Sequence, residues 1–136
     1  MDENQPDPMR LMTLEEVNQL VPAMESHIQE LHRLRDELSR KEVEIDALEL
    51  VADPKKRKAK VLDEKLDDYN RSVAHFYEVV DEIQRKGGLL KDLDLGLVDF
   101  YTRHEGRVVY LCWRLGEKEI KFWHEIGRGY RDRQPL

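Results

Sequence analysis

Carboxylates, a histidine and arginines that could build a binding site are concentrated in the C-terminal third of this 136-residue chain. They come from separate segments, and they could converge where a loop, several strand ends and the tail meet. Such a cluster could bind a ligand or a metal ion, and it could also support an enzyme. The candidate residues are Asp92, Asp94, Asp99, Arg107, Glu117, His124, Arg131 and Arg133.

The sequence matches two known metal-binding motifs only in part. The spacing Asp92-x-Asp94-x-Gly96-x-x-Asp99 is similar to a calcium loop, but leucines intervene and the twelfth position carries no glutamate. Cys112 and His124 lack the Cys-x-x-Cys or His-x-x-x-His partner of a structural zinc site. The sequence therefore predicts no metal site and no cofactor.

A metal cluster of Asp99, Cys112, Glu119 and His124 is also disfavoured, because the predicted strand register puts His124 on the core face, beyond Phe122. There we expect His124 to hydrogen-bond a carboxylate or a carbonyl near Arg107. Cys112 as a nucleophile needs an adjacent base and a lowered pKa, whereas strand cysteines in apolar company are usually inert. No catalytic motif stands out, which favours a non-catalytic role.

Composition narrows the class of protein. The net charge of −6 argues against a general nucleic-acid binder, which needs a basic surface. No apolar run has the length of a membrane span, and a single cysteine makes a reducing, cytoplasmic location the default. The basic run from Pro54 to Lys60 is interpreted as a solvated helix tip, and nucleic-acid binding through it ranks last among the functions considered for the protein.

The first two thirds of the chain predict a helical hairpin. Residues 1–12 are expected to be a disordered lead-in, and Thr13-Leu14-Glu15-Glu16 is a capping box that starts a helix over 13–52. Pro22 predicts a kink, or a new helix beginning there. After Asp53-Pro54, a second helix over 55–86 folds back on the first. Both carry heptad seams: Val17, Val21, Met24, Ile28, Leu31, Leu38 and Ile45, and Leu62, Leu66, Tyr69, Val73, Phe76, Val80 and Ile83.

Residues 89–125 predict a loop and a three-stranded antiparallel meander, followed by an irregular tail over 126–136. The strands are expected at 97–103, 107–114 and 118–124, with two-residue turns at Glu105-Gly106 and Leu115-Gly116. The predicted core face, which packs on the helices, is Val98, Phe100, Val109, Leu111, Trp113, Ile120 and Phe122.

The opposite sheet face is predicted to carry aromatic residues and Cys112, so we expect the tail, a second subunit or a ligand to cover it. On this face Asp99 lies across from Cys112 and Glu119, and Tyr101 across from Tyr110 and Lys121. The tail arginines are expected to pair with Asp92, Asp94 or Asp99.

Several short motifs carry a resemblance to a known family. They are Lys91-Asp92-Leu93-Asp94, Gly96-Leu97-Val98-Asp99-Phe100, Gly106-Arg107-Val108-Val109, Leu111-Cys112-Trp113, Gly116-Glu117, Trp123-His124 and Arg133-x-Pro135-Leu136. In this order the chain resembles the bacterial domain-of-unknown-function family 2203. The resemblance implies a small bacterial cytosolic protein with no established activity or cofactor, and a tail that docks on the domain.

Together these features predict one α+β domain: a long, coiled-coil-like antiparallel helical hairpin followed by the meander. The leading hypothesis is a non-catalytic interaction or assembly module that forms a homodimer, because one chain cannot fully bury two heptad seams. The alternative is the ligand- or metal-binding domain built from the candidate residues above.

Overall fold

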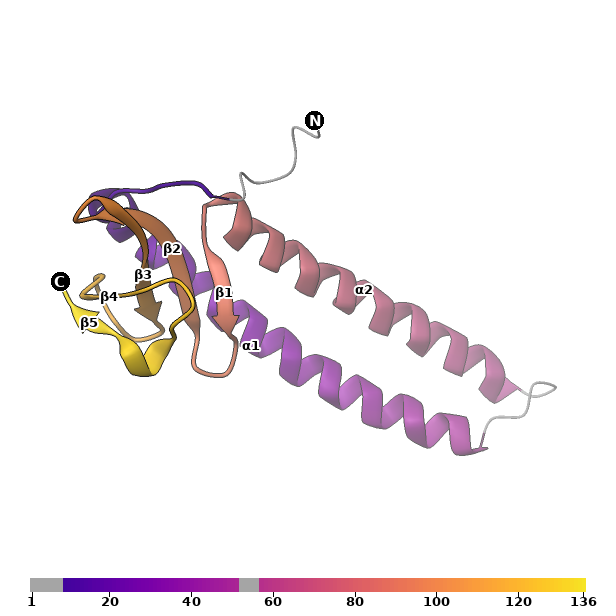
Figure 1. Ribbon diagram of the computed structural model, residues 1–136. Helices are drawn as coiled ribbons and strands as arrows, with labels where there is room; N and C mark the ends of the chain where they lie inside the picture. The colour runs from indigo at the N-terminus through magenta and orange to yellow at the C-terminus, as the bar shows by residue number, and fades with distance from the viewer. Residues whose placement is uncertain (1–8, 52–56) are drawn as a thin grey trace.

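A long helical hairpin with a small sheet packed against one end makes up the fold (Figure 1). The computed structural model describes residues 9–51 and 57–136, with the side chains of 57–59 also outside the description. Residues 1–8 of the expected lead-in, the break at Asp53-Pro54 and most of the basic run therefore lie outside the described residues. The predicted α+β class is confirmed.

Helix α1 (Leu14–Val51) begins directly after Thr13, the first residue of the predicted capping box. The amide of Glu16 donates to the Thr13 hydroxyl, and the amide of Thr13 donates to the Glu16 carboxylate, each at 3.1 Å. These bonds lower the pKa of Glu16 and satisfy amides that have no partner inside the helix. Pro22 lies inside α1, which continues past it, so no second helix begins there.

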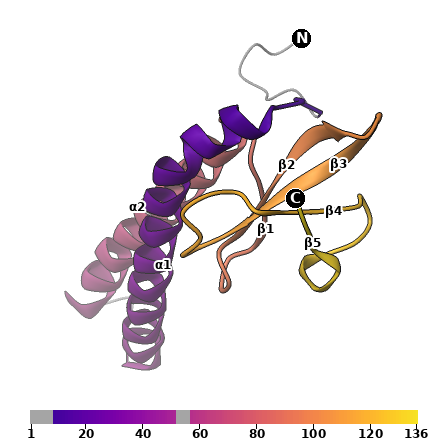
Figure 2. The same ribbon diagram turned by 90° about the vertical axis from the view of Figure 1, so that its left-hand side faces the viewer.

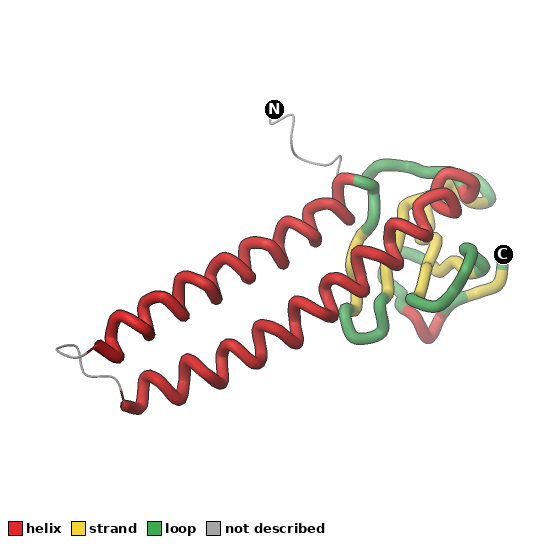
Figure 3. Tube along the Cα trace, turned by 180° about the vertical axis from the view of Figure 1, so that it is seen from behind, coloured by secondary structure: helices red, strands yellow, loops and turns green. Residues whose placement is uncertain are grey.

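Helix α2 (Arg57–Arg85) runs antiparallel to α1 (Figures 1 and 3). Most of the predicted α1 seam is buried, but Leu38 is only half-buried. On α2 only Ile83 of the predicted seam is buried, together with Val79 and Ser72, while the other seam residues are half-buried. The sheet covers only the end of the hairpin where α1 begins and α2 ends (Figure 2).

The sheet has five strands, not three. They are β1 (Leu89–Asp92), β2 (Leu97–His104), β3 (Arg107–Arg114), β4 (Phe122–His124) and β5 (Gln134–Pro135). All pair antiparallel in chain order, so the sheet is a meander with two additional short edge strands. The tail, expected to be irregular, supplies β5 and a short 3₁₀ turn over Tyr130–Asp132.

The register between β2 and β3 is as predicted. Glu105 and Gly106 form the two-residue turn, and both adopt positive φ, 51° and 80°, as the turns that match strand twist require. Asp99 consequently faces Cys112, and Tyr101 faces Tyr110.

The third predicted strand is wrong in both length and register. The chain leaves the sheet after Arg114 and rejoins it at Phe122, which pairs with Cys112 in place of Glu119. One local and one long-range hydrogen bond stabilise the intervening loop. The Trp113 indole donates to the Glu117 carbonyl at 2.8 Å, and the Ile120 amide donates to Asn18 of α1 at 2.7 Å.

This shift exchanges the faces of β4. Trp123 joins the core, whereas Phe122, predicted to be a core residue, is half-buried on the opposite face. The remaining predicted core-face residues are buried as expected.

The segment before α1 is part of the domain, contrary to the expectation of a lead-in up to residue 12. Met12 is buried in the core, its amide donates to the Tyr101 carbonyl at 2.9 Å, and its carbonyl accepts the Thr102 hydroxyl at 2.6 Å. The apolar Met12 side chain and these two bonds attach the segment to β2.

Candidate functional site

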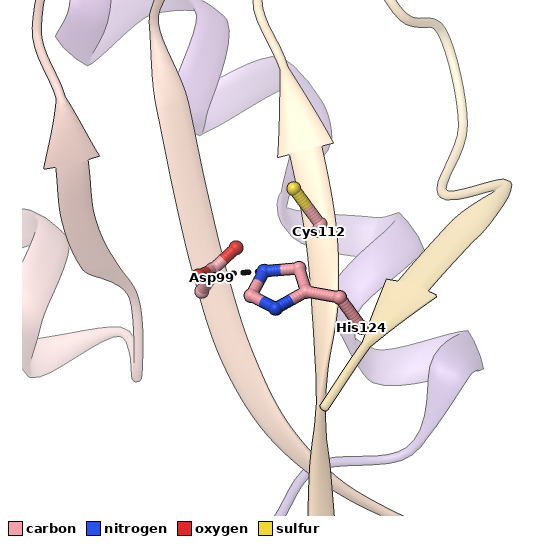
Figure 4. Close-up of side chains that lie close together, drawn as sticks. All are labelled: Asp99, Cys112 and His124. Carbon is pink, nitrogen blue, oxygen red and sulfur yellow. Dashed lines mark hydrogen bonds and ion pairs between the residues drawn. The ribbon is translucent and has the colours of Figure 1, made fainter. Parts of the chain in front are cut away.

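Three side chains with metal-ligand chemistry meet on the sheet face that points away from the helices (Figure 4). Asp99 comes from β2, Cys112 from the middle of β3 and His124 from the end of β4. Each is at most 2% exposed, and their ligand atoms all lie within 4.8 Å of one another. A burial this complete requires that the charges and hydrogen bonds of the group be balanced internally.

Both ring nitrogens of His124 face oxygen acceptors. Nε2 lies 3.0 Å from Oδ2 of Asp99, and Nδ1 lies 3.0 Å from the backbone carbonyl of Glu125. A carbonyl only accepts, so Nδ1 carries a hydrogen, and a further proton is shared between Nε2 and the Asp99 carboxylate. Whether this proton resides on the imidazole or on the carboxylate, the pair carries no net charge, which permits its burial.

The second carboxylate oxygen of Asp99 lacks a partner. Oδ1 is buried and accepts no N–H or O–H hydrogen bond in the described part of the chain, so the Cys112 thiol, a weak donor, is the one donor group that interacts with this carboxylate besides His124. A buried acceptor without a full hydrogen bond lowers the stability of the folded protein, so an oxygen of this kind indicates a missing binding partner.

Cys112 lies beside this carboxylate as a protonated thiol. Burial raises the pKa of the Cys112 thiol far above its usual range, the negative charge of Asp99 and a side-chain hydrogen bond to it raise it further, and the positive charge of Arg133 opposes these effects. Since thiolate is the nucleophilic form, the metal-free site disfavours nucleophilic catalysis by Cys112. His124 is no base for it either, because both of its nitrogens are engaged.

The predicted position of His124, which argued against this cluster, was therefore wrong. It depended on a register in which His124 lies on the core face, and the loop before β4 shifts that register. Glu119, the fourth residue considered, lies on that loop, exposed, 3.8 Å from Lys121. The expectation that His124 bonds a carboxylate or a carbonyl near Arg107 is met by Asp99 and Glu125, since Arg107 binds Glu125.

The tail lies against the same face next to the cluster. The Arg133 guanidinium donates to Glu117 at 2.6 Å, with its carbon 4.0 Å from the centre of the Phe122 ring. Phe122 in turn pairs with Cys112 across β3 and β4. The prediction that tail arginines pair with Asp92, Asp94 or Asp99 is wrong for Arg133, because Glu117 on the loop after β3 is its partner.

The remaining candidates lie elsewhere. Asp92 accepts the amide of Leu95 at 2.9 Å and shapes the turn after β1, and Asp94 forms an exposed ion pair with Arg35 at 2.5 Å. Arg107 binds Glu125 at the far end of β3, and Arg131 is exposed in the tail. The structure thus brings together Asp99 with His124 and Glu117 with Arg133.

Cys112 is the member of the cluster that the candidate set omitted. The predicted pairing of Asp99 with Cys112 already placed these two side by side. What was missing was the third strand, whose register depends on tertiary contacts.

Comparison with known proteins gives one match. The family described as "Uncharacterized conserved protein (DUF2203)" matches residues 10–136. No curated protein and no solved structure matches the chain. Neither of the described helices is both long and apolar enough to cross a membrane.

Proposed function

The chain belongs to the DUF2203 family of uncharacterised conserved proteins, and for this member we propose a function in binding a divalent metal ion of the zinc type through Asp99, Cys112 and His124. The observation that carries the proposal is the unpartnered Oδ1 of the buried Asp99 beside a thiol and an imidazole nitrogen. A metal ion bound there would give this oxygen a partner.

The orientation of His124 supports the same proposal. Its Nδ1–H donates to the Glu125 carbonyl, which leaves Nε2 facing Asp99. Metal-ligating histidines commonly donate their other ring nitrogen to a carbonyl or carboxylate, because this fixes the ring and its tautomer.

Charge balance also favours a divalent ion. A carboxylate, a thiolate and a neutral imidazole carry two negative charges together, so a divalent ion makes a neutral site that can stay buried. Thiolate and imidazole ligands suit zinc better than magnesium or calcium. Tetrahedral zinc needs ligand atoms about 3.3–3.6 Å apart, so atoms now within 4.8 Å converge through small side-chain rotations.

The test is to load the purified protein with zinc, remove free metal, and measure bound metal by elemental analysis. We expect one zinc per chain, with loss in Cys112→Ala and retention in the matched control Glu119→Ala. Cobalt substitution adds a readout independent of any variant, because a thiolate ligand gives a charge-transfer band in the near ultraviolet. Wild-type protein that retains no zinc and shows no such band would overturn the proposal.

A second candidate function is self-association through the hairpin, the assembly role expected from the sequence. Where the sheet does not reach, a groove of about 320 Å³ runs between the helices. Tyr77 on its rim is 63% exposed. The lining residues are Arg35, Leu38, Ser39, Glu42, Tyr69, Val73, Phe76 and Tyr77.

The occupant that fits this groove is a second copy packed as an antiparallel, two-fold coiled coil. A two-fold axis beside Leu38 and Ser39 sets Arg35 of each copy against Glu42 of the other, because these positions are equidistant from the axis. The Glu42 side chain has no hydrogen bond or ion pair within the described residues, so a partner arginine would complement it. Small Ser39 at the axis allows close approach.

Light scattering coupled to size exclusion tests this arrangement at micromolar concentration. We expect a dimer that Glu42→Arg weakens by placing arginines opposite each other, and that Arg35→Glu combined with Glu42→Arg restores. A wild-type monomer, or a double variant no better than the single one, would reject it.

A further inference from the structure

The loop after β3 and the tail line an open, arginine-rich pocket near the buried cluster. This pocket of about 670 Å³ contains three arginines, one carboxylate and two aromatic rings. They are Arg114, Arg131, Arg133, Glu117, Phe122 and Tyr130. At neutral pH these residues carry two more positive than negative charges. Such an excess on an acidic protein marks the pocket as a place for an anion.

The arginines are held in place before any ligand binds. Tyr130 accepts a hydrogen bond from Arg114 at 2.7 Å, and its ring centre lies 5.3 Å from the Arg114 guanidinium carbon and 4.8 Å from that of Arg133. One aromatic ring thus positions two guanidinium groups. Preorganised donors lose less entropy on binding a ligand, which makes the site more effective than flexible surface arginines.

Hydrogen-bonding capacity remains unused. The side chain of Arg133 is only 8% exposed. Its Nη2 donates to Glu117, but its buried Nε has no partner among the described residues. Arg131 makes no hydrogen bond or ion pair within the same part of the chain. Donors without partners, one of them buried, point to a ligand with several acceptor oxygens.

We propose that this pocket binds the dianionic phosphate group of a small phosphomonoester or of inorganic phosphate. A phosphate dianion matches the two excess charges, and its tetrahedral oxygens suit the forked geometry of arginine. The inference deepens the proposed function, since Phe122 and Arg133 lie between the pocket and Cys112 and would set the anion beside the metal. Anion binding itself does not require the metal.

Calorimetric titration of metal-free and zinc-loaded wild-type protein with inorganic phosphate and with glycerol 3-phosphate tests the inference, with glycerol as the neutral control. We expect both anions, and not glycerol, to bind metal-free protein. Tighter binding of the ester than of inorganic phosphate would identify a phosphorylated small molecule as the ligand; the reverse would identify free phosphate.

Two arginine variants locate the site. Arg131→Ala should weaken phosphate binding about tenfold, the value of one charge-assisted hydrogen bond. Arg128→Ala, a matched exposed arginine outside the pocket lining, should leave it unchanged. The proposed phosphate site is rejected if metal-free protein binds no phosphate, or if the two variants have equal effects. It is also rejected if phosphate binds only the zinc-loaded protein and the Arg131→Ala substitution does not change that binding, but this last result would still support the metal site.

Discussion

The hydrogen bond between Asp99 and His124 joins two strands that do not pair with each other. β3 lies between β2 and β4, and the two side chains meet above Cys112, with Nε2 and Oδ2 3.0 Å apart. The bond thus spans three strands at a fully buried position. It links β4 to β2 across β3, independently of the backbone hydrogen bonds between neighbouring strands.

Breaking this pair from one side should be costly. His124→Leu leaves the Asp99 carboxylate buried without its partner, and we expect the free energy of unfolding to fall by about 3–5 kcal/mol. Replacing both residues, Asp99→Leu with His124→Leu, removes the stranded charge and should recover much of the loss. Urea denaturation of the metal-free proteins measures this double-mutant cycle; simple additivity of the two single changes would contradict a coupled pair.

The Cys112 thiol predicts a loss of stability at alkaline pH. Burial raises its pKa above the usual value of 9.0, so above that pH the unfolded chain has released a proton that the folded chain retains. Folded protein then binds more protons than unfolded protein, and stability falls as pH rises, by up to about 1.4 kcal/mol per pH unit.

The measurement compares unfolding of metal-free wild type and Cys112→Ala from about pH 8 to about pH 10. Other groups titrate in both proteins, so the difference in slope belongs to the thiol. We expect the wild type to lose more stability than the variant, and parallel slopes would show that the thiol is not responsible.

Asn18 should fix the loop before β4. Its side-chain oxygen accepts the amide of buried Ile120 at 2.7 Å, so Asn18→Ala leaves a buried donor unpaired. We expect a loss of about 1–3 kcal/mol in unfolding free energy. Asn18→Asp keeps an acceptor at the same position and serves as the matched control; if both variants lose equally, the hydrogen bond is not what matters.

Gly88 should not accept a side chain. A Cβ there would lie 2.9 Å from methyl groups of both Ile83 and Val98, where α2 passes into β1. We expect Gly88→Ala to cost about 1–3 kcal/mol through overpacking. Gly129, whose φ of −134° is ordinary and whose Cβ would meet nothing within 4 Å, provides the control. Thermal unfolding of the two alanine variants should separate them clearly.

How far the sequence predicts this structure depends on how local each signal is. The Thr13 capping box and the Glu105-Gly106 turn act within a few residues, so the start of α1 and the β2–β3 register follow from them. Leu115-Gly116 also has the sequence of a two-residue turn, but the chain forms a longer loop there. The side chain of Asn18 stabilises this loop through Ile120, 102 residues away in the sequence.

The same distinction between local and long-range signals applies to the residues of the site. Asp99 and Cys112 were placed correctly because they belong to the local hairpin. His124 was not, because a change of register in β4 moves each of its side chains to the other face. The partner of Arg133 was missed for a related reason, since Glu117 lies on the same unpredicted loop.

The shortness of β5 has a kinetic consequence. Only Gln134 and Pro135 pair with β4, and one further bond joins the Leu136 amide to the Lys121 carbonyl at 2.9 Å. So few hydrogen bonds open at a small fraction of the free energy of global unfolding. Arg133, directly before this strand, lies on Phe122, which pairs with Cys112, so detachment of these few residues would remove the cover beside the buried cluster. The residence time of an ion at the cluster would then follow the local opening rate of the tail, while the protein as a whole stays folded.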